Sequence, residues 1–308
     1  MKINCLVLLF FLFAIYPKIH SQNYIPYYNL VNEAEICVFL GKKDLAFGLY
    51  NKAFSLKRIS PKAKDLYFMG KLHLERKEKE KATAYFKKIF PLPDGQFSLW
   101  ANKQKNYFLD YYQENEFRDL VSEAEAKENE YFLKVKFIRD SLDLFISEDQ
   151  RLRKIFVDSI QPRYKEGDKI YDLFAERVNS NDYENQSRFL SFIKKHGYPG
   201  TYLIGHDGAA TILMHIHCIL FGEYRETLYS LLLKGKMEPF YYAEMVNETS
   251  RKCGDFFGVV YHVDSASLAC ETYPGYLAEQ RASIGLSNYF KDSGTRPYVQ
   301  RQLLKWVE

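Results

Sequence analysis

Apolar residues recur at three- and four-residue steps along most of the chain, the spacing that places them on one face of an α-helix. The pattern is clearest between 129 and 147, where the apolar positions are Tyr131, Phe132, Val135, Ile138, Leu142 and Phe145. It predicts one connecting helix over 129–147 and a further helix beginning at Glu148. The chain as a whole is therefore expected to be mainly α.

Two segments of the N-terminal half repeat at an interval of 36 residues. The matching positions are Ala34, Ala46, Tyr50 and Ala53 in the first segment, and Gly70, Ala82, Phe86 and Ile89 in the second. Gly41 and Lys77 fall at matching turn positions between them. Small residues let two helices approach closely, so each segment is expected to form a helical hairpin.

This pattern resembles the tetratricopeptide repeat, which has a period near 34 residues and small, small, aromatic and small positions at these spacings. Pro61 and Pro93 lie where such units commonly end, and a third, weaker unit is expected from Phe97 to Lys127. Ile89 departs from the pattern, because a small residue is usual there, and the tryptophan position is not met. The resemblance implies a short helical-repeat solenoid over 24–128. An irregular helical bundle with accidental spacing is the alternative.

The second half, 148–292, is expected to be a mainly helical domain that carries a small β-hairpin near 256–272. Its helices are predicted at 182–196, 207–221, 223–234, 237–252 and 276–285. Gly197 provides a left-handed stop for the first of these helices, and Asp207 provides a side-chain cap for the second. The tail over 293–308 is expected to be peripheral.

The N-terminus has the three-part pattern of a secretory signal peptide. Lys2 supplies positive charge, Cys5 to Tyr16 is an apolar run of 12 residues, and Ser21 is small. We expect removal of 1–21, so that the mature chain starts at about Gln22. A membrane anchor is the alternative, but the run is shorter than the roughly 20 residues needed to cross a bilayer. The protein is expected to be exported, to the periplasm or outside the cell, without stable membrane insertion.

Charge and repeats together favour a protein or peptide partner. The formal net charge is +4, and loss of Lys2 and Lys18 with the signal peptide leaves +2. This charge is too small to indicate nucleic-acid binding. Helical-repeat surfaces bind extended segments of other proteins, so the first hypothesis is a non-enzymatic binding protein or scaffold that engages a peptide or a neighbouring envelope protein. The candidate binding residues are the aromatic side chains Tyr28, Tyr50, Tyr67, Tyr85 and Phe86.

Four cysteines remain after removal of the signal peptide: Cys37, Cys218, Cys253 and Cys270. An even number allows three complete pairings. We favour a disulfide between Cys253 and Cys270, because these residues flank the predicted hairpin. The alternative is four buried reduced thiols, because a chain of 308 residues needs no covalent staples.

Three groups of residues in the second half form an ordered set: Asp149, Gln150 and Arg153; the turn His196-Gly197-Tyr198-Pro199-Gly200; and Arg281, Gly285 and Leu286. Over roughly 140–291 they resemble an uncharacterised domain family found widely in bacteria. The middle departs from the family pattern, because His215 and His217 lack a Gln partner and Phe257-Gly258-Val259 replaces Tyr-Gly-Thr. The resemblance implies a domain without assigned activity. If the family is enzymatic, this copy is a candidate for lost activity.

The second hypothesis is a hydrolase-like or ligand-binding enzyme centred on Asp149, Arg153, His196, His217 and Arg281. His196 with Asp149 makes a general base and its orienting carboxylate. Simpler roles are a histidine at a helix C-terminus for His196, and an i,i+4 ion pair for Asp149 with Arg153. Convergence of the five side chains in one pocket distinguishes the enzyme from the binding protein.

Metal ligation has weak candidates in His206, His215 and His262. His215 and His217 are two residues apart on a predicted helix and point about 200° from one another, so they cannot share one ion. The alternative is that one is a hydrogen-bonded core histidine and the other faces solvent. The sequence implies no particular cofactor.

Overall fold

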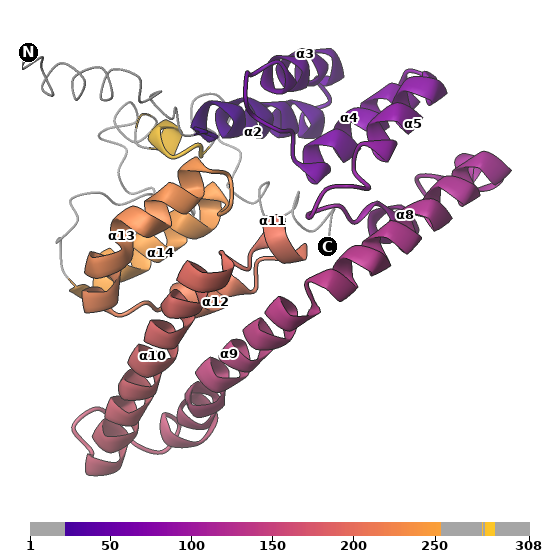
Figure 1. Ribbon diagram of the computed structural model, residues 1–308. Coiled ribbons are helices and arrows are strands. Elements are labelled where there is room, and N and C mark those ends of the chain that lie inside the picture. The colour runs from indigo at the N-terminus through magenta and orange to yellow at the C-terminus, as the bar shows by residue number, and fades with distance from the viewer. Residues whose placement is uncertain (1–21, 254–278, 280, 287–308) are drawn as a thin grey trace, which may run out of the picture.

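The computed structural model describes residues 22–253, 279 and 281–286. Within these residues every regular element is a helix, which confirms the expectation of a mainly α protein (Figure 1). Outside them lie the predicted signal peptide at 1–21, the β-hairpin near 256–272 and the tail at 293–308. None of the described helices is long and apolar enough to cross a bilayer.

The N-terminal part of the chain forms α2 (Ile25–Phe39), α3 (Lys43–Phe54), α4 (Ala63–Glu75), α5 (Lys79–Lys87), α6 (Phe97–Lys103), α7 (Leu109–Tyr112) and α8 (Asn115–Lys134). The rest forms α9 (Lys136–Ile155), the π-helical segment η1 (Phe156–Ile160), α10 (Lys169–His196), α11 (Thr201–Ile204), α12 (Ala209–Leu213), α13 (Cys218–Leu233) and α14 (Pro239–Cys253). A further helical turn is described at Arg281.

The 36-residue repetition corresponds to two helical hairpins, α2 with α3 and α4 with α5 (Figure 1). Gly41 and Lys77, at the matching turns, both have positive φ, 72° and 61°. In the second hairpin a Cβ atom on Gly70 would lie 2.3 Å from the ring of Phe86. The glycine therefore permits the close approach of α4 and α5, as its position in the repeat predicts.

Helix α4 is buried on nearly every side, because it carries apolar residues all around its axis. Phe68, Met69 and Leu72 belong to a core shared with α2, α3 and the C-terminal helices. Leu66 and Tyr67 belong to a second core with residues of α5, α6 and α8. Helix α4 thus lies between two cores, and the polar groups of its first turn are buried with it.

The first hairpin shares one hydrophobic core with the second half of the chain. Tyr27 and Val31 of α2 belong to the same cluster as Phe189 of α10, Leu228 of α13 and Val246 of α14. Apolar burial is the main stabilising contribution to a fold. A boundary between 128 and 148 therefore does not separate two independent cores.

The predicted connecting helix at 129–147 is not a separate element. Its residues up to Lys134 belong to α8, and α9 runs through the predicted boundary at Glu148 to Ile155. Neither Gly nor Pro occurs near 148, so nothing stops α9 there. Figure 1 shows α8 and α9 as a long rod interrupted at Val135, with α10 returning beside α9.

The end of α10 follows the sequence prediction, but its start does not. The helix ends at His196, and Gly197 follows with a φ of 88°. It begins at Lys169, although the helix is predicted to start at Asp182. A glycine that can adopt positive φ is a strong stop signal. The earlier turns carry apolar residues at three- and four-residue steps, at Ile170, Leu173 and Phe174, which the predicted start at Asp182 leaves out.

The single helix predicted at 207–221 is wrong, because the chain breaks between α12 and α13. Gln186 of α10 is fully buried at this break. Its side-chain amide donates to the carbonyl oxygen of His215 at 2.9 Å and accepts from the backbone N–H of His217 at 2.8 Å. It also donates to the carbonyl oxygen of Ile212 at 3.4 Å. The break is stable because Gln186 replaces hydrogen bonds that a continuous helix would supply.

The predicted disulfide between Cys253 and Cys270 is wrong, because Cys253 is bonded to Cys218. This bond joins the first residue of α13 to the last residue of α14, whose Cα atoms lie 6.0 Å apart. The helix break before Cys218 places that residue at a helix end, beside the end of the packed α14. Within the described residues Cys37 is a free cysteine, and it is buried.

Candidate ligand-binding site

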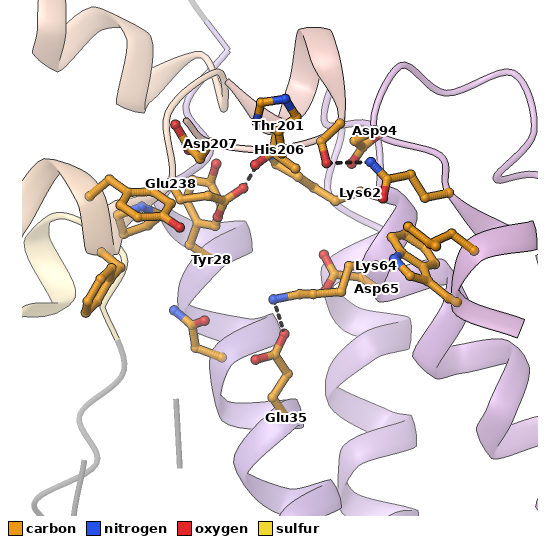
Figure 2. A pocket seen from close by; sticks show the side chains of 18 of the residues that line it. Tyr28, Glu35, Lys62, Lys64, Asp65, Asp94, Thr201, His206, Asp207 and Glu238 are labelled. Atoms are coloured by element: carbon orange, nitrogen blue, oxygen red, sulfur yellow. Dashed lines mark hydrogen bonds and ion pairs between the residues drawn. The ribbon is translucent and has the colours of Figure 1, made fainter. Parts of the chain in front are cut away.

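A cavity of about 280 Å³ lies between the N-terminal hairpins and the C-terminal helices. Its lining comes from α2, the start of α4, the loop before α6, α6 itself, the α11–α12 linker and the start of α14. Figure 2 shows Lys64 and Asp65 on one side, Asp207 and Glu238 on another, and Lys62 between them. The cavity is therefore built from residues that lie far apart in the sequence.

Asp65 in the first turn of α4 is a buried carboxyl group of this cavity, 2% exposed. Its Oδ2 accepts a hydrogen bond from the hydroxyl of Tyr27 at 2.5 Å. Its Oδ1 is buried and has no hydrogen-bond partner among the described residues. Burial is the largest cause that raises the pKa of Asp65, to about 7, although the nearby Lys64 opposes the shift.

Asp207 in the α11–α12 linker repeats this arrangement from the other half of the chain. Its Oδ1 accepts a hydrogen bond from the hydroxyl of Tyr198 at 2.6 Å. Its Oδ2 is buried and has no hydrogen-bond partner within the part of the chain that the structure describes. Burial raises the pKa of Asp207 to about 7, and the Tyr198 hydrogen bond opposes the shift.

The turn before α11 positions Asp207 through a close packing of Tyr198. A Cβ atom on Gly200 would lie 2.2 Å from the ring of Tyr198 and 3.2 Å from Oδ1 of Asp207. Only glycine therefore leaves room for this ring and carboxylate together. Asp207 was predicted as a helix cap, but α12 begins after Gly208 without a side-chain cap. The aromatic-Pro-Gly turn thus serves the cavity and not the helix start.

The buried Lys62 and the half-buried Lys64 of the cavity already have partners. Lys62 donates from Nζ to the carbonyl oxygen of Gly235 at 2.5 Å and to Oε1 of Glu238 at 3.2 Å. Lys64 forms an ion pair with Glu35 at 2.7 Å (Figure 2). Burial lowers the pKa of Lys62, but Glu238 and its other neighbours outweigh burial, so the pKa lies well above its usual range. Both lysines are held as ammonium groups by carboxylates of the same cavity.

Aromatic side chains complete the lining. Tyr28, Trp100, Phe240 and Tyr241 line the cavity from α2, α6 and α14. Gln96 donates to the carbonyl oxygen of Gly205 at 2.6 Å, which ties the loop before α6 to the linker after α11. Apolar walls with a few convergent polar groups are typical of small-ligand sites.

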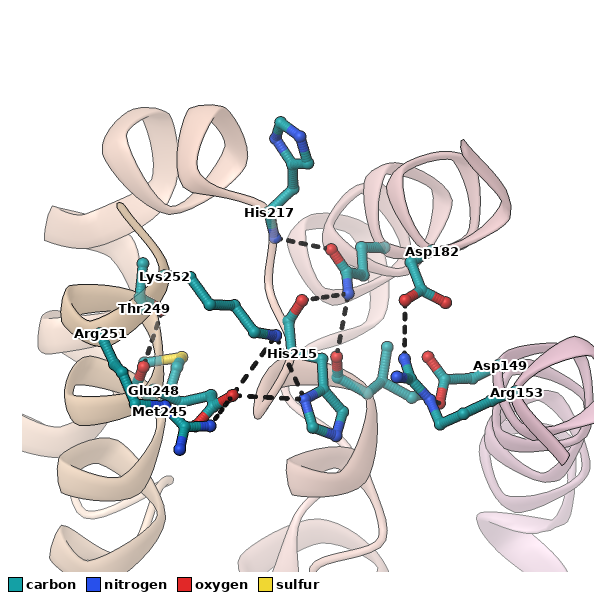
Figure 3. A network of polar contacts seen from close by, with 12 residues as sticks. Asp149, Arg153, Asp182, His215, His217, Met245, Glu248, Thr249, Arg251 and Lys252 are labelled. Atoms are coloured by element: carbon teal, nitrogen blue, oxygen red, sulfur yellow. Dashed lines mark hydrogen bonds and ion pairs between the residues drawn. The ribbon is translucent and has the colours of Figure 1, made fainter. Parts of the chain in front are cut away.

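A separate polar network contains two of the five sequence-predicted enzyme residues (Figure 3). The guanidinium of Arg153 lies 2.6 Å from Oδ2 of Asp182 and 3.9 Å from Oδ2 of Asp149. Burial is the largest cause that raises the pKa of Asp149, to about 6. On the neighbouring side, Nδ1 of His215 lies 3.4 Å from Nζ of Lys252. Burial, followed by Arg153 and Lys252, lowers the pKa of His215 to about 4.

The other three predicted enzyme residues lie elsewhere. His196, in the last turn of α10, packs against the rings of Phe137 and Phe192, with centroids 5.5 and 4.7 Å away. His217 caps α13 by accepting from the backbone N–H of Ile219, and Figure 3 shows its ring directed away from the network. Arg281 is buried in the helical turn that packs on α2, where Asn29 donates to the carbonyl oxygen of Ala282. The five side chains do not converge, and none of them lines the cavity.

The aromatic residues predicted to bind a partner are mostly core residues. Tyr50 and Tyr67 are fully buried and Phe86 is 1% exposed, so the prediction of a binding role for these three is wrong. Aromatic positions of the repeat pack between helices, as Phe86 does against Gly70. Tyr85 is half-buried and stacks on His73 away from the cavity. Tyr28 alone among the five lines the cavity.

The three histidines predicted as weak metal ligands lie in different places. His206 lines the cavity, His215 belongs to the polar network, and His262 lies outside the described residues. Within the described residues no group of three or more His, Cys, Asp or Glu side chains could hold a metal ion. The break before α13 also removes the helix on which the spacing argument for His215 and His217 depends.

Sequence reasoning missed Asp65, Lys62 and Trp100 as site residues. A signal was present: Lys62, Lys64 and Asp65 directly precede the apolar run Leu66–Met69 of a helix that is apolar all round. A helix that is apolar all round is itself buried, and its burial takes Lys62 and Asp65 out of solvent. Their partners, however, come from distant segments that no local pattern identifies.

No protein-family model matches the chain, and no curated protein and no solved structure matches it.

Proposed function

We propose that the chain is an exported, non-enzymatic binding protein, and that it holds a peptide or a segment of another protein in the cavity between its two halves. The observation that carries this proposal is the cavity itself. It combines aromatic walls with two buried carboxyl groups, Asp65 and Asp207, that each keep one oxygen without a partner among the described residues. Buried polar groups normally have partners, so these oxygens favour a ligand site.

The repeats supply the rest of the proposal. The hairpins α2–α3 and α4–α5, with α6–α8 as a third and less regular unit, form a short tetratricopeptide-like solenoid. The matching turns at Gly41 and Lys77 and the close packing at Gly70 support this assignment. Such solenoids bind extended chains on one face. The C-terminal helices cover part of that face and make the cavity. The β-hairpin near 256–272 lies outside the described residues and stays part of the proposal.

Export is supported by the covalent chemistry of the chain. The disulfide between Cys218 and Cys253 is a bond that persists in oxidising compartments such as the periplasm or the extracellular space. The signal-peptide pattern at 1–21 directs the chain to such a compartment. The two observations are independent of each other.

The hydrolase-like alternative has less support. Asp149 and Arg153 meet near His215, but His196, His217 and Arg281 are engaged elsewhere. Arg153 bridges Asp149 and Asp182, an arrangement that balances buried charge. Neutralising these two buried carboxylates is a structural role that explains the network without catalysis.

Selection from a displayed library of random peptides against the full chain tests the binding function. Leu99 of α6 lines the cavity and is 43% exposed, so Leu99→Trp fills the cavity without disturbing a core. Leu144→Trp on α9, at a residue 66% exposed, is the matched control. We expect selected peptides to bind the control as they bind the unmodified chain, and to lose affinity for Leu99→Trp. Failure to select any peptide, or equal binding to both variants, contradicts the proposal.

A further inference from the structure

We propose that the cavity recognises a primary ammonium group of its ligand, received by the carboxylates of Asp65 and Asp207. This inference rests on the proposed binding function and names the chemistry of the ligand. The two carboxyl groups come from opposite halves of the chain and line the same cavity. Each has one oxygen fixed by a buried tyrosine hydroxyl, at 2.5 Å for Tyr27 and 2.6 Å for Tyr198.

The fixed hydroxyls orient the two acids. A tyrosine that donates to one carboxylate oxygen leaves the other oxygen to accept from something else. Oδ1 of Asp65 and Oδ2 of Asp207 are these other oxygens, and both are buried without a hydrogen-bond partner in the described part of the chain. An ammonium group supplies three donors and a positive charge, which suits two such acceptors.

The protein's own cations do not balance these acids. Five carboxyl groups and three ammonium groups line the cavity. Lys62 is held by Glu238 and Gly235, and Lys64 is held by Glu35. The third, Lys103, is exposed to solvent at the end of α6. When Asp65 and Asp207 are ionised, the cavity has more negative than positive groups, and a cationic ligand stabilises that ionised form.

The lining favours an organic cation. The rings of Tyr28 and Trp100 line the cavity and offer apolar contact to the body that carries an ammonium group. The acids are too widely dispersed to form a metal site, since no group of three or more metal-ligating side chains exists within the described residues. A metal ion requires several ligands at about 2–2.6 Å, whereas an ammonium group can donate to two carboxylates directly or through bridging water.

A fluorescence titration tests the inference on the full chain. The sequence contains two tryptophans, so Trp306→Phe leaves Trp100 in the cavity as the reporter. Two probes carry an ammonium group: L-phenylalanine amide represents a peptide N-terminus, and Nα-acetyl-L-lysine amide represents a lysine side chain. N-acetyl-L-phenylalanine amide is the uncharged control. We expect at least one ammonium probe to bind about tenfold more tightly than the uncharged one, and the tighter probe identifies the source.

Two substitutions locate the ammonium group. Asp65→Asn and Asp207→Asn each keep an oxygen for the tyrosine hydroxyl and remove the charge. Each substitution is expected to lower the affinity for the ammonium probe about tenfold or more. Asp158→Asn, at an exposed residue of η1, is the control and should leave that affinity unchanged. Circular dichroism verifies folding, and where one variant does not fold the other decides the test.

Three results overturn the inference: equal binding of the charged and uncharged probes, no response to either ammonium probe, or unchanged affinity in the folded Asn variants. If any of these results occurs while selected peptides still lose affinity for Leu99→Trp, only the ammonium inference is wrong and the binding function stands. If no peptide is selected and neither ammonium probe binds, the proposed binding function is wrong as well.

Discussion

The carboxyl groups of Asp65 and Asp207 are unusual because burial dominates their electrostatics. Both have a pKa raised to about 7 from an ordinary value of 3.8. A hydrogen bond from a tyrosine stabilises the charged form of each, yet the loss of water outweighs it. Such groups are costly to keep in a fold unless a ligand uses them, and they are typical of functional sites.

These pKa values predict how stability changes with pH. An acid whose pKa is higher in the folded chain contributes stability below its unfolded pKa, near 4, and loses it as the pH rises through about 7. Asp65→Asn and Asp207→Asn remove this dependence. Relative to the unmodified chain, each variant should gain unfolding free energy between pH 4 and 7, by up to about 1.4 kcal/mol per pH unit. Urea denaturation at pH 5 and pH 8 measures the gain, and an equal difference at both values contradicts it.

Close packing at Gly70 gives a prediction for the hairpins at the scale of the element. The ring of Phe86 cannot move aside, because the rings of Phe97 and Tyr67 lie 4.7 and 5.9 Å away and all three are buried. Gly70→Ala should therefore lower the unfolding free energy by about 1–3 kcal/mol. Gly48→Ala is the control, since nothing lies within 4 Å of its Cβ position in α3, and it should raise stability by about 0.5–1 kcal/mol. Chemical denaturation of both variants measures the contrast, and two effects of the same sign would count against the packing.

The disulfide between α13 and α14 gives a second prediction at this scale. It closes a loop with a sequence separation of 35, so its loss should lower the unfolding free energy by about 3–4 kcal/mol. Cys218→Ser and reduction of the unmodified chain should lower the unfolding free energy by the same amount. Cys37→Ser removes no disulfide, so reduction should still lower the unfolding free energy of that variant. Peptide mapping without reductant should recover Cys218 linked to Cys253. Recovery of Cys253 linked to Cys270 would refute the pairing.

The elements differ in how far the sequence predicts them. The end of α10 is predictable because Gly197 is a local signal for positive φ. The break between α12 and α13 is not, because the group that stabilises it, Gln186, comes from another helix. The disulfide pairing follows that break, because the break places Cys218 at a helix end beside Cys253. The prediction relied instead on the hairpin that Cys253 and Cys270 would flank, so it missed Cys218.

At the scale of the whole molecule, the cavity could not be predicted for the same reason. The apolar run after Asp65 is a local signal for the burial of that residue, but no local pattern connects it with Asp207. Only the packing of α4 against the C-terminal helices brings the two acids to one cavity. The hairpins of the repeat are predictable because their spacing is local. The site is a product of how distant elements pack together.

A shared core predicts that the two halves depend on each other. Tyr27 of α2 packs in one cluster with Phe189, Leu228 and Val246, so separation exposes large apolar surfaces on both sides. Fragments 22–147 and 148–308, made separately, should lack a cooperative unfolding transition. Thermal melting followed by circular dichroism measures this. A cooperative transition in either fragment alone, equal to that of the full chain, would show that the halves fold as independent domains.

Hydrogen–deuterium exchange of the full chain, with and without its tightest selected peptide, tests the central claim most directly. If the ligand lies between the two halves, protection should appear together at the start of α4, in the loop before α6, in the α11–α12 linker and at the start of α14, all of which line the cavity. Leu99→Trp should abolish this pattern and Leu144→Trp should preserve it. Protection confined to one half of the chain, or to helices that do not line the cavity, would contradict the account.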